Sequence, residues 1–143
     1  MSTNQLSTFY VDKKLYGINV KLVQEITKAM PITPVPLAPY FIHGLINLRG
    51  QIATAVGLRE LFKLNPAEEN QSKINVVCKV EGLLISLVVD EVGDVLELED
   101  TLFESTPDTV NFQVSQFMTG VYKLPHALLS VIDISKVVTY LNQ

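Results

Sequence analysis

Apolar and polar residues alternate most clearly in the stretch 41–64. Two short apolar runs, 45–48 and 52–56, are separated by Arg49-Gly50. Because glycine adopts φ > 0 without a steric penalty, this pair suits the tight turn of a β-hairpin. The pattern therefore predicts a hairpin with an arginine at its tip.

After this hairpin, and again near the end of the chain, the apolar spacing becomes helical. We expect one short helix over 57–64 and a second over 134–141. Asp133 precedes the second helix, and its carboxylate can accept a hydrogen bond from the first turn. Both helices are expected to pack an apolar face inward.

Apolar runs bounded by turn residues predict strands along the rest of the chain. The run 83–89 is almost continuously apolar, so we expect it to be buried on both faces. Segments 30–39, which holds four of the seven prolines, and 100–115 are expected to be connectors. The pattern indicates an all-β protein built as small barrels or sandwiches. The expected strands, besides the hairpin, are 7–11, 15–20, 73–80, 83–89, 92–98, 117–124 and 127–132.

The chain repeats part of its own pattern. Apolar positions from Gly44 onward recur in step from Gly120 onward, and those from Gly17 recur from Ser86. A self-similar pattern of this length implies two copies of one small module. The polar segment 67–72 marks the expected boundary between the copies.

Composition narrows the class of protein. The chain has 143 residues, 48% of them hydrophobic, and a net charge of −4 with acids and bases interspersed. No run of lysine or arginine could neutralise a row of phosphates, which argues against nucleic acid as a partner. The N-terminus lacks the features of a signal peptide and no apolar run reaches membrane-spanning length, so we expect a soluble cytoplasmic protein.

The single cysteine, Cys78, cannot belong to a disulfide framework. It stands among valines, and free cysteine of this kind usually behaves as a small buried apolar residue. We therefore expect a structural thiol in the core.

Residues that could carry catalysis do not form a set. His43 and His126 lie at different positions of the repeat, without cysteine or aspartate at ligand spacing. The carboxylates Glu97, Glu99 and Asp100 are explained by a solvated strand end. We expect no catalytic residues, no metal site and no cofactor.

The segment after residue 19 changes its spacing, because Val20, Val23 and Ile26 recur every third residue. The repeat aligns Val92 with Val23 and Val95 with Ile26. Either the two modules pack on each other through these aliphatic residues, or a partner protein does. If Val23 lines a seam between the modules, Val92 is expected to line it too, and such a seam suits a partner helix.

The sequence leaves two roles open for Arg49. An exposed arginine at a hairpin tip contributes little to stability. Alternatively, its guanidinium pairs with the carboxylate of Glu25 and fixes the hairpin beside the aliphatic residues.

The order of these motifs resembles the CheW family of chemotaxis coupling proteins. The resemblance extends from about residue 7 to residue 141 and implies one CheW-like domain over 1–143. It implies two pseudo-symmetric five-stranded barrels that share a hydrophobic seam, with a first module over about 20–70, a second over about 73–132, and terminal segments that bridge them. The matching segments are LYGINVKLVQEI (15–26), TPVP (33–36), GLINLRGQ (44–51), LLISLVVDEVGDVL (83–96), TGVYKL (119–124) and LLSVIDISKVV (128–138).

The resemblance also implies a function. Members are non-enzymatic cytoplasmic scaffolds that join the regulatory domain of the histidine kinase CheA to the cytoplasmic hairpin tips of chemoreceptors. They reach membrane receptor arrays through these partners, without inserting into the membrane. The positions that match the receptor-binding residues are Val20, Val23, Ile26 and Val92, with Glu25 and Arg49 as the associated ion pair. Kinase contact is expected at the hairpin 120–131, around Leu124, Pro125 and His126.

Two positions depart from the family pattern. Gly57 stands where the family usually has an aspartate, so the first helix lacks a capping carboxylate, at a cost of about 1 kcal/mol. The turn Pro125-His126 replaces a turn of Asp-Gly type. The alternative function is a small-ligand-binding β-barrel or an enzyme subunit with its site at the seam between the modules.

Overall fold

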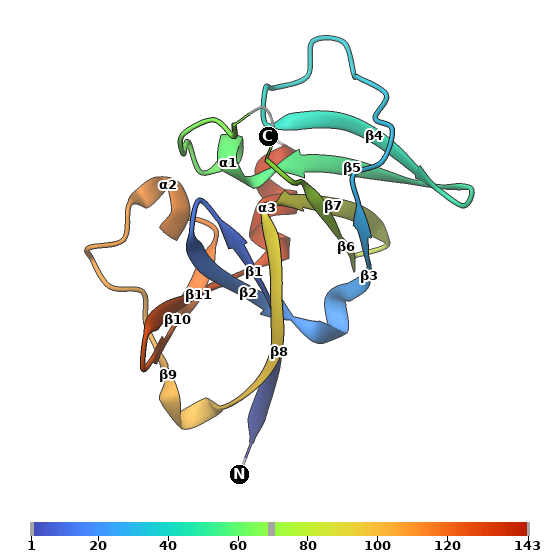
Figure 1. Ribbon diagram of the computed structural model, residues 1–143. Helices are drawn as coiled ribbons and strands as arrows, with labels where there is room; N and C mark the ends of the chain where they lie inside the picture. Colours follow the sequence, from blue (N-terminus) through green and yellow to red (C-terminus); the bar gives the residue numbers. More distant parts are fainter. Residues whose placement is uncertain (1, 69–70, 143) are drawn as a thin grey trace.

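The computed structural model describes residues 2–68 and 71–142, in which eleven strands form two sheets (Figure 1). The six-stranded sheet contains, in spatial order, β8 (Glu91–Glu99), β1 (Thr3–Val11), β2 (Lys14–Asn19), β11 (Ala127–Ile132), β10 (Met118–Leu124) and β9 (Phe103–Glu104). The five-stranded sheet contains β3 (Val23–Lys28), β6 (Ile74–Val80), β7 (Leu83–Val89), β5 (Gln51–Gly57) and β4 (Ile42–Leu48). The helical segments are η1 (Val20–Leu22), α1 (Leu58–Leu61), η2 (Asp100–Leu102), α2 (Phe112–Ser115) and α3 (Ile134–Leu141).

Apart from the additional edge strand β9, the two sheets share one topology, as the sequence repeat predicts. Neighbouring strands are antiparallel except for one parallel pair in each sheet, β2 with β11 and β5 with β7. Each repeat is divided between the sheets, with β1 and β2 separated from β3, β4 and β5, and β6 and β7 separated from β8, β10 and β11. After β2 the chain crosses through η1 to β3, and after β7 it crosses to β8.

The two sheets therefore divide the chain differently from the modules expected over about 20–70 and about 73–132. Strands β6 and β7 lie in the sheet of β3, β4 and β5, whereas β1 and β2 lie with β8 to β11. The expectation of closed barrels is also wrong, because each sheet remains open. The backbone ladders run from edge to edge, and no ladder joins β3 to β4 or β8 to β9 in the described chain.

The main core lies between the sheets and takes side chains from both. On β7, alternate residues serve different clusters: Ile85, Leu87 and Val89 join the main core, whereas Val88 points to a smaller cluster behind the five-stranded sheet. The prediction that 83–89 is buried on both faces is confirmed over most of its length, since Ile85–Val89 are all buried. This explains why the strand lacks an alternating pattern.

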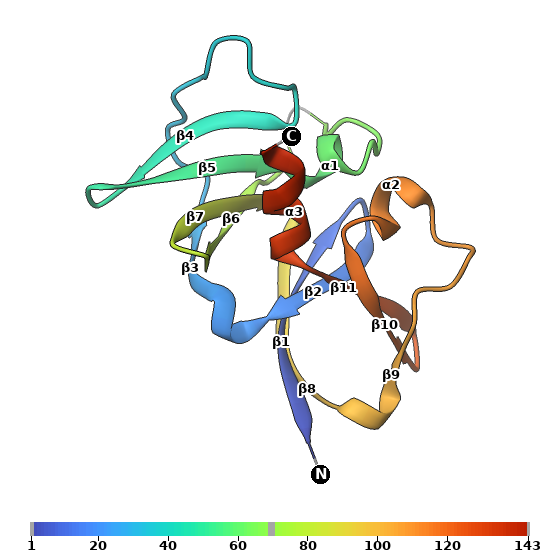
Figure 2. The same ribbon diagram turned by 180° about the vertical axis from the view of Figure 1, so that it is seen from behind.

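Helix α3 covers one side of the junction between the sheets (Figure 2). Its bounds are those predicted, and the Asp133 carboxylate accepts a hydrogen bond of 2.9 Å from the Ser135 amide. Buried Val137 and Val138 pack into the main core. The helix therefore links the two sheets on the side opposite that of Figure 1.

Helix α1 is shorter than predicted, because it begins at Leu58 and its last residue is Leu61. Gly57 precedes it in an extended conformation and offers no side chain to cap it. A second difference lies in the expected connector 100–115, which contains η2, β9 and α2. Asn111 begins α2 by accepting a hydrogen bond from the Gln113 amide, a local signal that the apolar pattern did not contain.

Candidate protein-interaction site

Strand β3 carries an irregularity that decides which way its side chains point. Val23 pairs with Cys78 and Glu25 pairs with Val77, so one extra residue is inserted on β3. Directly paired residues point to the same face of a sheet, and a bulge of this kind shifts the alternation by one. Val23 and the later Ile26, which pairs with Val76, therefore both face the side of the main core.

Strand β8 has the same feature at the equivalent place. Val92 pairs with Phe9 and Val95 pairs with Ser7, with a register shift between Ser7 and Phe9. Phe9 belongs to the main core, so Val92 and Val95 also share one face. The two bulged strands thus present two pairs of aliphatic residues in repeat-related positions.

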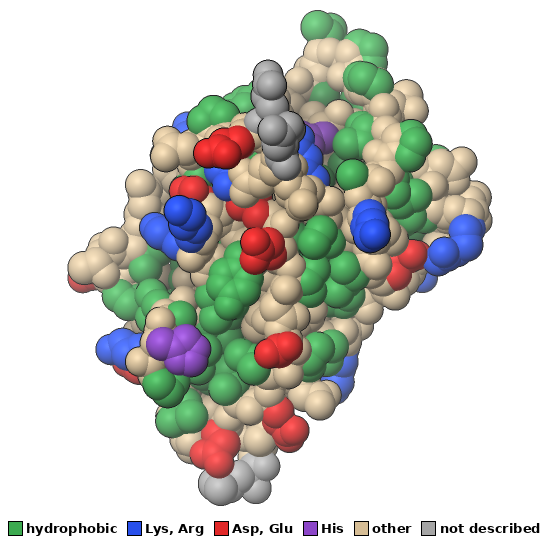
Figure 3. Space-filling model, viewed as in Figure 1, with side chains coloured by type: hydrophobic (Ala, Val, Ile, Leu, Met, Phe, Trp, Pro, Cys, Tyr) green, Lys and Arg blue, Asp and Glu red, His purple; other side chains and the backbone are tan. Residues whose placement is uncertain are grey.

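Because β3 and β8 are edge strands, these four residues are incompletely covered. Relative exposure is 42% for Ile26, 36% for Val92 and 58% for Val95, whereas Val23 is half-buried against the main core. We call Val23, Ile26, Val92 and Val95 the edge-strand surface. On the face shown in Figure 3, hydrophobic side chains are exposed among acidic and basic ones.

Val20, the fifth residue considered, lies in η1 and is half-buried. The η1 segment contacts both β1 and β6, so it spans the junction between the sheets. Val95 was absent from the predicted set, although the repeat aligned it with Ile26. The repeat alignment was a usable signal for Val95. The apolar pattern of β8, however, does not predict the bulge that places Val92 and Val95 on one face.

The ion pair expected between Arg49 and Glu25 is formed, with 2.5 Å between Arg49 Nη2 and Glu25 Oε1. The Arg49 side chain is mostly exposed, at 78%, whereas the Glu25 side chain is 20% exposed. Arg49 and Gly50 form the hairpin tip with positive φ, and the Asn47 side chain accepts a hydrogen bond from the Gly50 amide. The pair therefore joins β3 to the β4–β5 hairpin. Strands β3 and β4 are the opposite edges of the five-stranded sheet.

The residues expected to contact a kinase lie at the tip of the β10–β11 hairpin. Pro125 and His126 are exposed and Leu124 is half-buried. His126 borders a hollow of about 560 Å³ whose lining also includes Lys13 and Lys14 of the β1–β2 turn. This tip is in the six-stranded sheet, in a different part of the fold from the ion pair of Glu25 and Arg49.

His43 lies against Glu60 of α1, with 2.9 Å between His43 Nε2 and Glu60 Oε1. Burial alone would raise the pKa of Glu60, but the hydrogen bond and charge of His43 outweigh it, so the pKa lies below its ordinary value. A side chain at Gly57 would overlap both partners. The pair therefore occupies the space that a capping aspartate at residue 57 would need.

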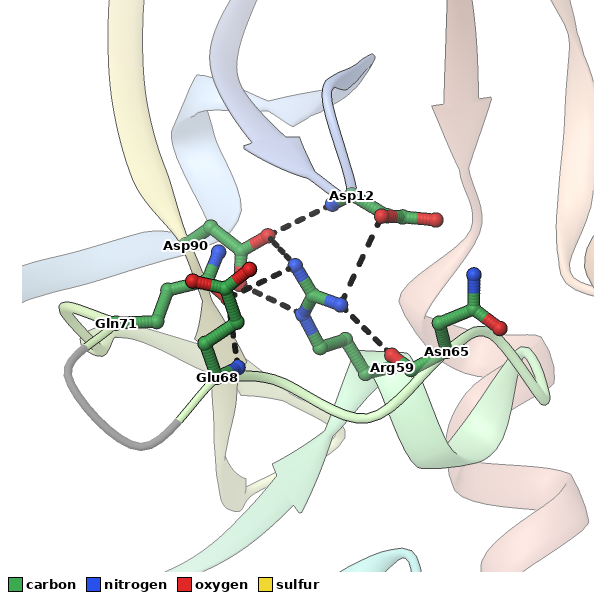
Figure 4. A network of polar contacts seen from close by, with 6 residues as sticks. All are labelled: Asp12, Arg59, Asn65, Glu68, Gln71 and Asp90. Carbon is green, nitrogen blue, oxygen red and sulfur yellow. Dashed lines mark hydrogen bonds and ion pairs between the residues drawn. The ribbon is translucent and has the colours of Figure 1, made fainter.

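A second buried polar network is centred on Arg59 (Figure 4). Its guanidinium donates to both carboxylate oxygens of Asp90, at 3.1 and 2.8 Å, and to the carbonyl oxygen of Asn65 at 2.7 Å. The hydrogen bond to Asp90 raises the pKa of Arg59 further above its ordinary range, although burial opposes it. Sequence analysis missed this network, because its members lie far apart in the sequence, in the β1–β2 turn, in α1 and the loop after it, and between β7 and β8.

The single thiol of the chain has a structural role in the core. Cys78 is fully buried, as predicted, and burial raises the pKa of its thiol to about 12, which leaves it protonated and unreactive. Across residues 2–68 and 71–142, no three histidine, cysteine or acidic side chains converge as a metal site would require. No helix in this part of the chain has the length and apolar character needed to cross a bilayer.

Comparison with known families gives a match over nearly the whole chain, since the model of the CheW-like domain matches residues 5–141. The chain belongs to the CheW family. It is accordingly a non-enzymatic scaffold protein of chemotaxis signalling. The family favours this function over the alternative of a small-ligand-binding barrel or enzyme subunit.

Individual relatives agree with this assignment. Chemotaxis protein CheW of Treponema pallidum (strain Nichols) is 29% identical over 136 residues, which cover 92% of this chain and 80% of the relative. Chemotaxis protein CheW of Bacillus subtilis (strain 168) is 29% identical, with 93% and 85% covered. The crystal structure of the scaffolding protein TtCheW from Thermoanaerobacter tengcongensis superposes with a TM-score of 0.83 at 26% identity, covering 92% of this chain and 90% of that one.

Proposed function

We propose that this CheW-family scaffold couples chemoreceptors to the regulatory domain of the histidine kinase CheA in the cytoplasm. In this proposal the helical hairpin tip of a chemoreceptor binds the edge-strand surface, with Val20 at its margin. The kinase binds elsewhere, at the β10–β11 hairpin around Leu124, Pro125 and His126. Separate surfaces allow both partners to bind one molecule of the scaffold at the same time.

The proposed receptor site rests on one observation: aliphatic residues at repeat-related positions are exposed on two bulged edge strands. Edge strands usually carry charged residues that prevent association, yet Ile26, Val92 and Val95 remain 36–58% exposed. We take these exposed apolar residues to form part of a protein-binding surface, because large apolar side chains left open to solvent commonly mark such surfaces. A helical hairpin has apolar stripes that such a surface can cover.

The ion pair of Glu25 and Arg49 supports the site indirectly. It ties β3 to the β4–β5 hairpin, so the strand that carries Val23 and Ile26 is held by this contact as well as by its pairing with β6. We propose that the pair orients β3 for receptor binding and contributes little affinity itself, because Arg49 is largely exposed.

The test is a pair of binding measurements with reciprocal variants. Val92→Asp places a charge in the receptor surface, and Leu128→Asp places one on the β10–β11 hairpin at a matched exposure of 39% against 36%. We expect Val92→Asp to weaken binding of a chemoreceptor hairpin-tip fragment by about 100-fold or more while retaining kinase binding. We expect Leu128→Asp to show the opposite pattern.

Isothermal titration with the receptor fragment and with the CheA regulatory domain would measure both affinities, and circular dichroism would confirm that the variants fold. Receptor binding by folded Val92→Asp at the affinity of the unmodified protein would refute the receptor site. Kinase binding by Leu128→Asp without loss would refute the kinase site alone.

A further inference from the structure

Strand β8 begins at a place where the chain changes sheets. Asp90 is the single residue between the end of β7 in one sheet and the start of β8 in the other. Val92, two residues later, belongs to the edge-strand surface. The position of Asp90 therefore fixes where the exposed part of β8 starts relative to the five-stranded sheet.

Asp90 is held by groups from both sides of this crossing. Its carboxylate accepts from Arg59 of α1 and, through Oδ2, from the backbone amide of Asp12 at 2.7 Å. Its own amide donates to the Tyr10 carbonyl at 3.0 Å. Asp12 and Tyr10 belong to the β1–β2 hairpin of the six-stranded sheet, whereas α1 follows β5 of the other sheet.

The Arg59–Asp90 contact is buried and directional. Arg59 and Asp90 side chains are only 11% and 10% exposed, and the two hydrogen bonds between them are parallel. A bidentate pair of this kind constrains orientation as well as distance, which a single lysine contact does not. Arg59 also lies 3.7 Å from the Asp12 carboxylate, so one guanidinium links α1, the crossing and the opposite hairpin.

We infer that Arg59 and Asp90 are positioning residues for the partner surface, because they fix β8 against the five-stranded sheet. The inference rests on the proposed receptor site. With the pair intact, Val92 and Val95 of β8 are held in a fixed relation to Val23 and Ile26 of β3, so that one rigid partner contacts all four. Without it, β8 stays paired with β1 but loses its side-chain link to α1, so the relation of Val92 and Val95 to Val23 and Ile26 is no longer fixed.

The experiment compares affinity with stability. Arg59→Met keeps the length of the side chain but removes its charge and donors, and Asp90→Asn is a milder second variant if Arg59→Met does not fold. Either substitution leaves a buried polar partner unsatisfied and will lower the free energy of unfolding. A matched control is a β4 variant, Ile46→Val or Ile46→Ala, whichever lowers that free energy by the same amount, since Ile46 is 1% exposed and lies in the smaller cluster of the five-stranded sheet.

Binding of a chemoreceptor hairpin-tip fragment is measured at a temperature where each protein is almost entirely folded. A residue that only stabilises the fold would then leave the dissociation constant unchanged. We expect the dissociation constant to rise roughly five- to tenfold for Arg59→Met and to remain unchanged for the Ile46 control. We also expect amide hydrogen exchange of Val92 and Val95 to accelerate more than that of Val76 on β6.

Each outcome separates the inference from the proposed function. Unchanged affinity in folded Arg59→Met and Asp90→Asn, together with loss in Val92→Asp, overturns the positioning role and leaves the receptor site standing. An equal loss in the Ile46 control also overturns it, because stability would then explain the effect. Full binding by Val92→Asp would instead show that the receptor site itself is wrongly assigned.

Discussion

Gly57 illustrates how one residue depends on neighbours distant in sequence. The extended backbone before α1 lacks a capping side chain, as the sequence predicted. The structure adds that His43 of β4 and Glu60 of α1 fill the adjacent space and pair with each other. The absence of a side chain at residue 57 and the presence of the His43–Glu60 pair thus depend on each other, because both cannot occupy the same space.

Restoring the family aspartate is therefore expected to harm this protein. Gly57→Asp should lower the free energy of unfolding by about 1–3 kcal/mol, because its side chain overlaps His43 and Glu60. In the background His43→Ala with Glu60→Ala both overlapping side chains are removed, and the same substitution should stabilise by about 1 kcal/mol through the cap. Urea unfolding of the four proteins in this cycle measures both effects, and destabilisation of equal size in both backgrounds would contradict the overlap.

At the scale of elements, side-chain contacts link β3 to the β4–β5 hairpin of the five-stranded sheet, where no backbone hydrogen bonds join the two edges. Its edges, β3 and β4, are not hydrogen-bonded to each other, so the sheet is open rather than a barrel. The β4–β5 hairpin nevertheless reaches back to β3 through Arg49 and Glu25, and Gln24 donates to the Gln51 side chain at 3.4 Å. These contacts cover the smaller core without closing the ladder.

The energy of this link is expected to be small. Because Arg49 is 78% exposed, a double-mutant cycle with Arg49→Ala and Glu25→Ala should give a coupling free energy of about 0.5 kcal/mol in unfolding by urea. The same cycle at high salt should give a smaller value, since exposed charges are screened. A coupling that is absent at low salt would show that the pair does not hold the hairpin.

For the whole molecule, the two crossings of the chain between the sheets, after β2 and after β7, make the two halves interdependent. Each sheet contains strands of both repeats, and the main core takes side chains from both sheets. Helix α3 adds Val137 and Val138 to the same core. Neither sheet retains its full set of strands and core contacts if the other unfolds.

We therefore expect one cooperative unfolding transition. Leu87→Ala, at a fully buried position of the main core, should lower the free energy of unfolding by about 2–5 kcal/mol. The loss should be equal for the slowest-exchanging amides of β1 and of β7, which lie in different sheets. Hydrogen exchange in dilute denaturant measures this, and a loss confined to β7 would indicate sheets that unfold independently.

The sequence by itself determined most of the elements and their local chemistry. The turn at Arg49-Gly50, the cap at Asp133, the buried Cys78 and the strand 83–89 follow from residue type and short-range spacing. Self-similarity also indicated the duplicated topology and aligned Val95 with Ile26. These features are readable because the interactions that create them lie within a few residues of one another, or repeat.

Only the tertiary structure decided how the repeats combine. Three features depend on pairing between distant strands: the division of each repeat between two sheets, the open sheets, and the bulges that place Ile26 on the face of Val23 and Val95 on the face of Val92. The contact of Arg59 with Asp90 likewise joins residues 31 apart in sequence. Such contacts are selected by the packing of the whole core, and a side-chain pattern along one segment contains no information about which partner strand it will meet.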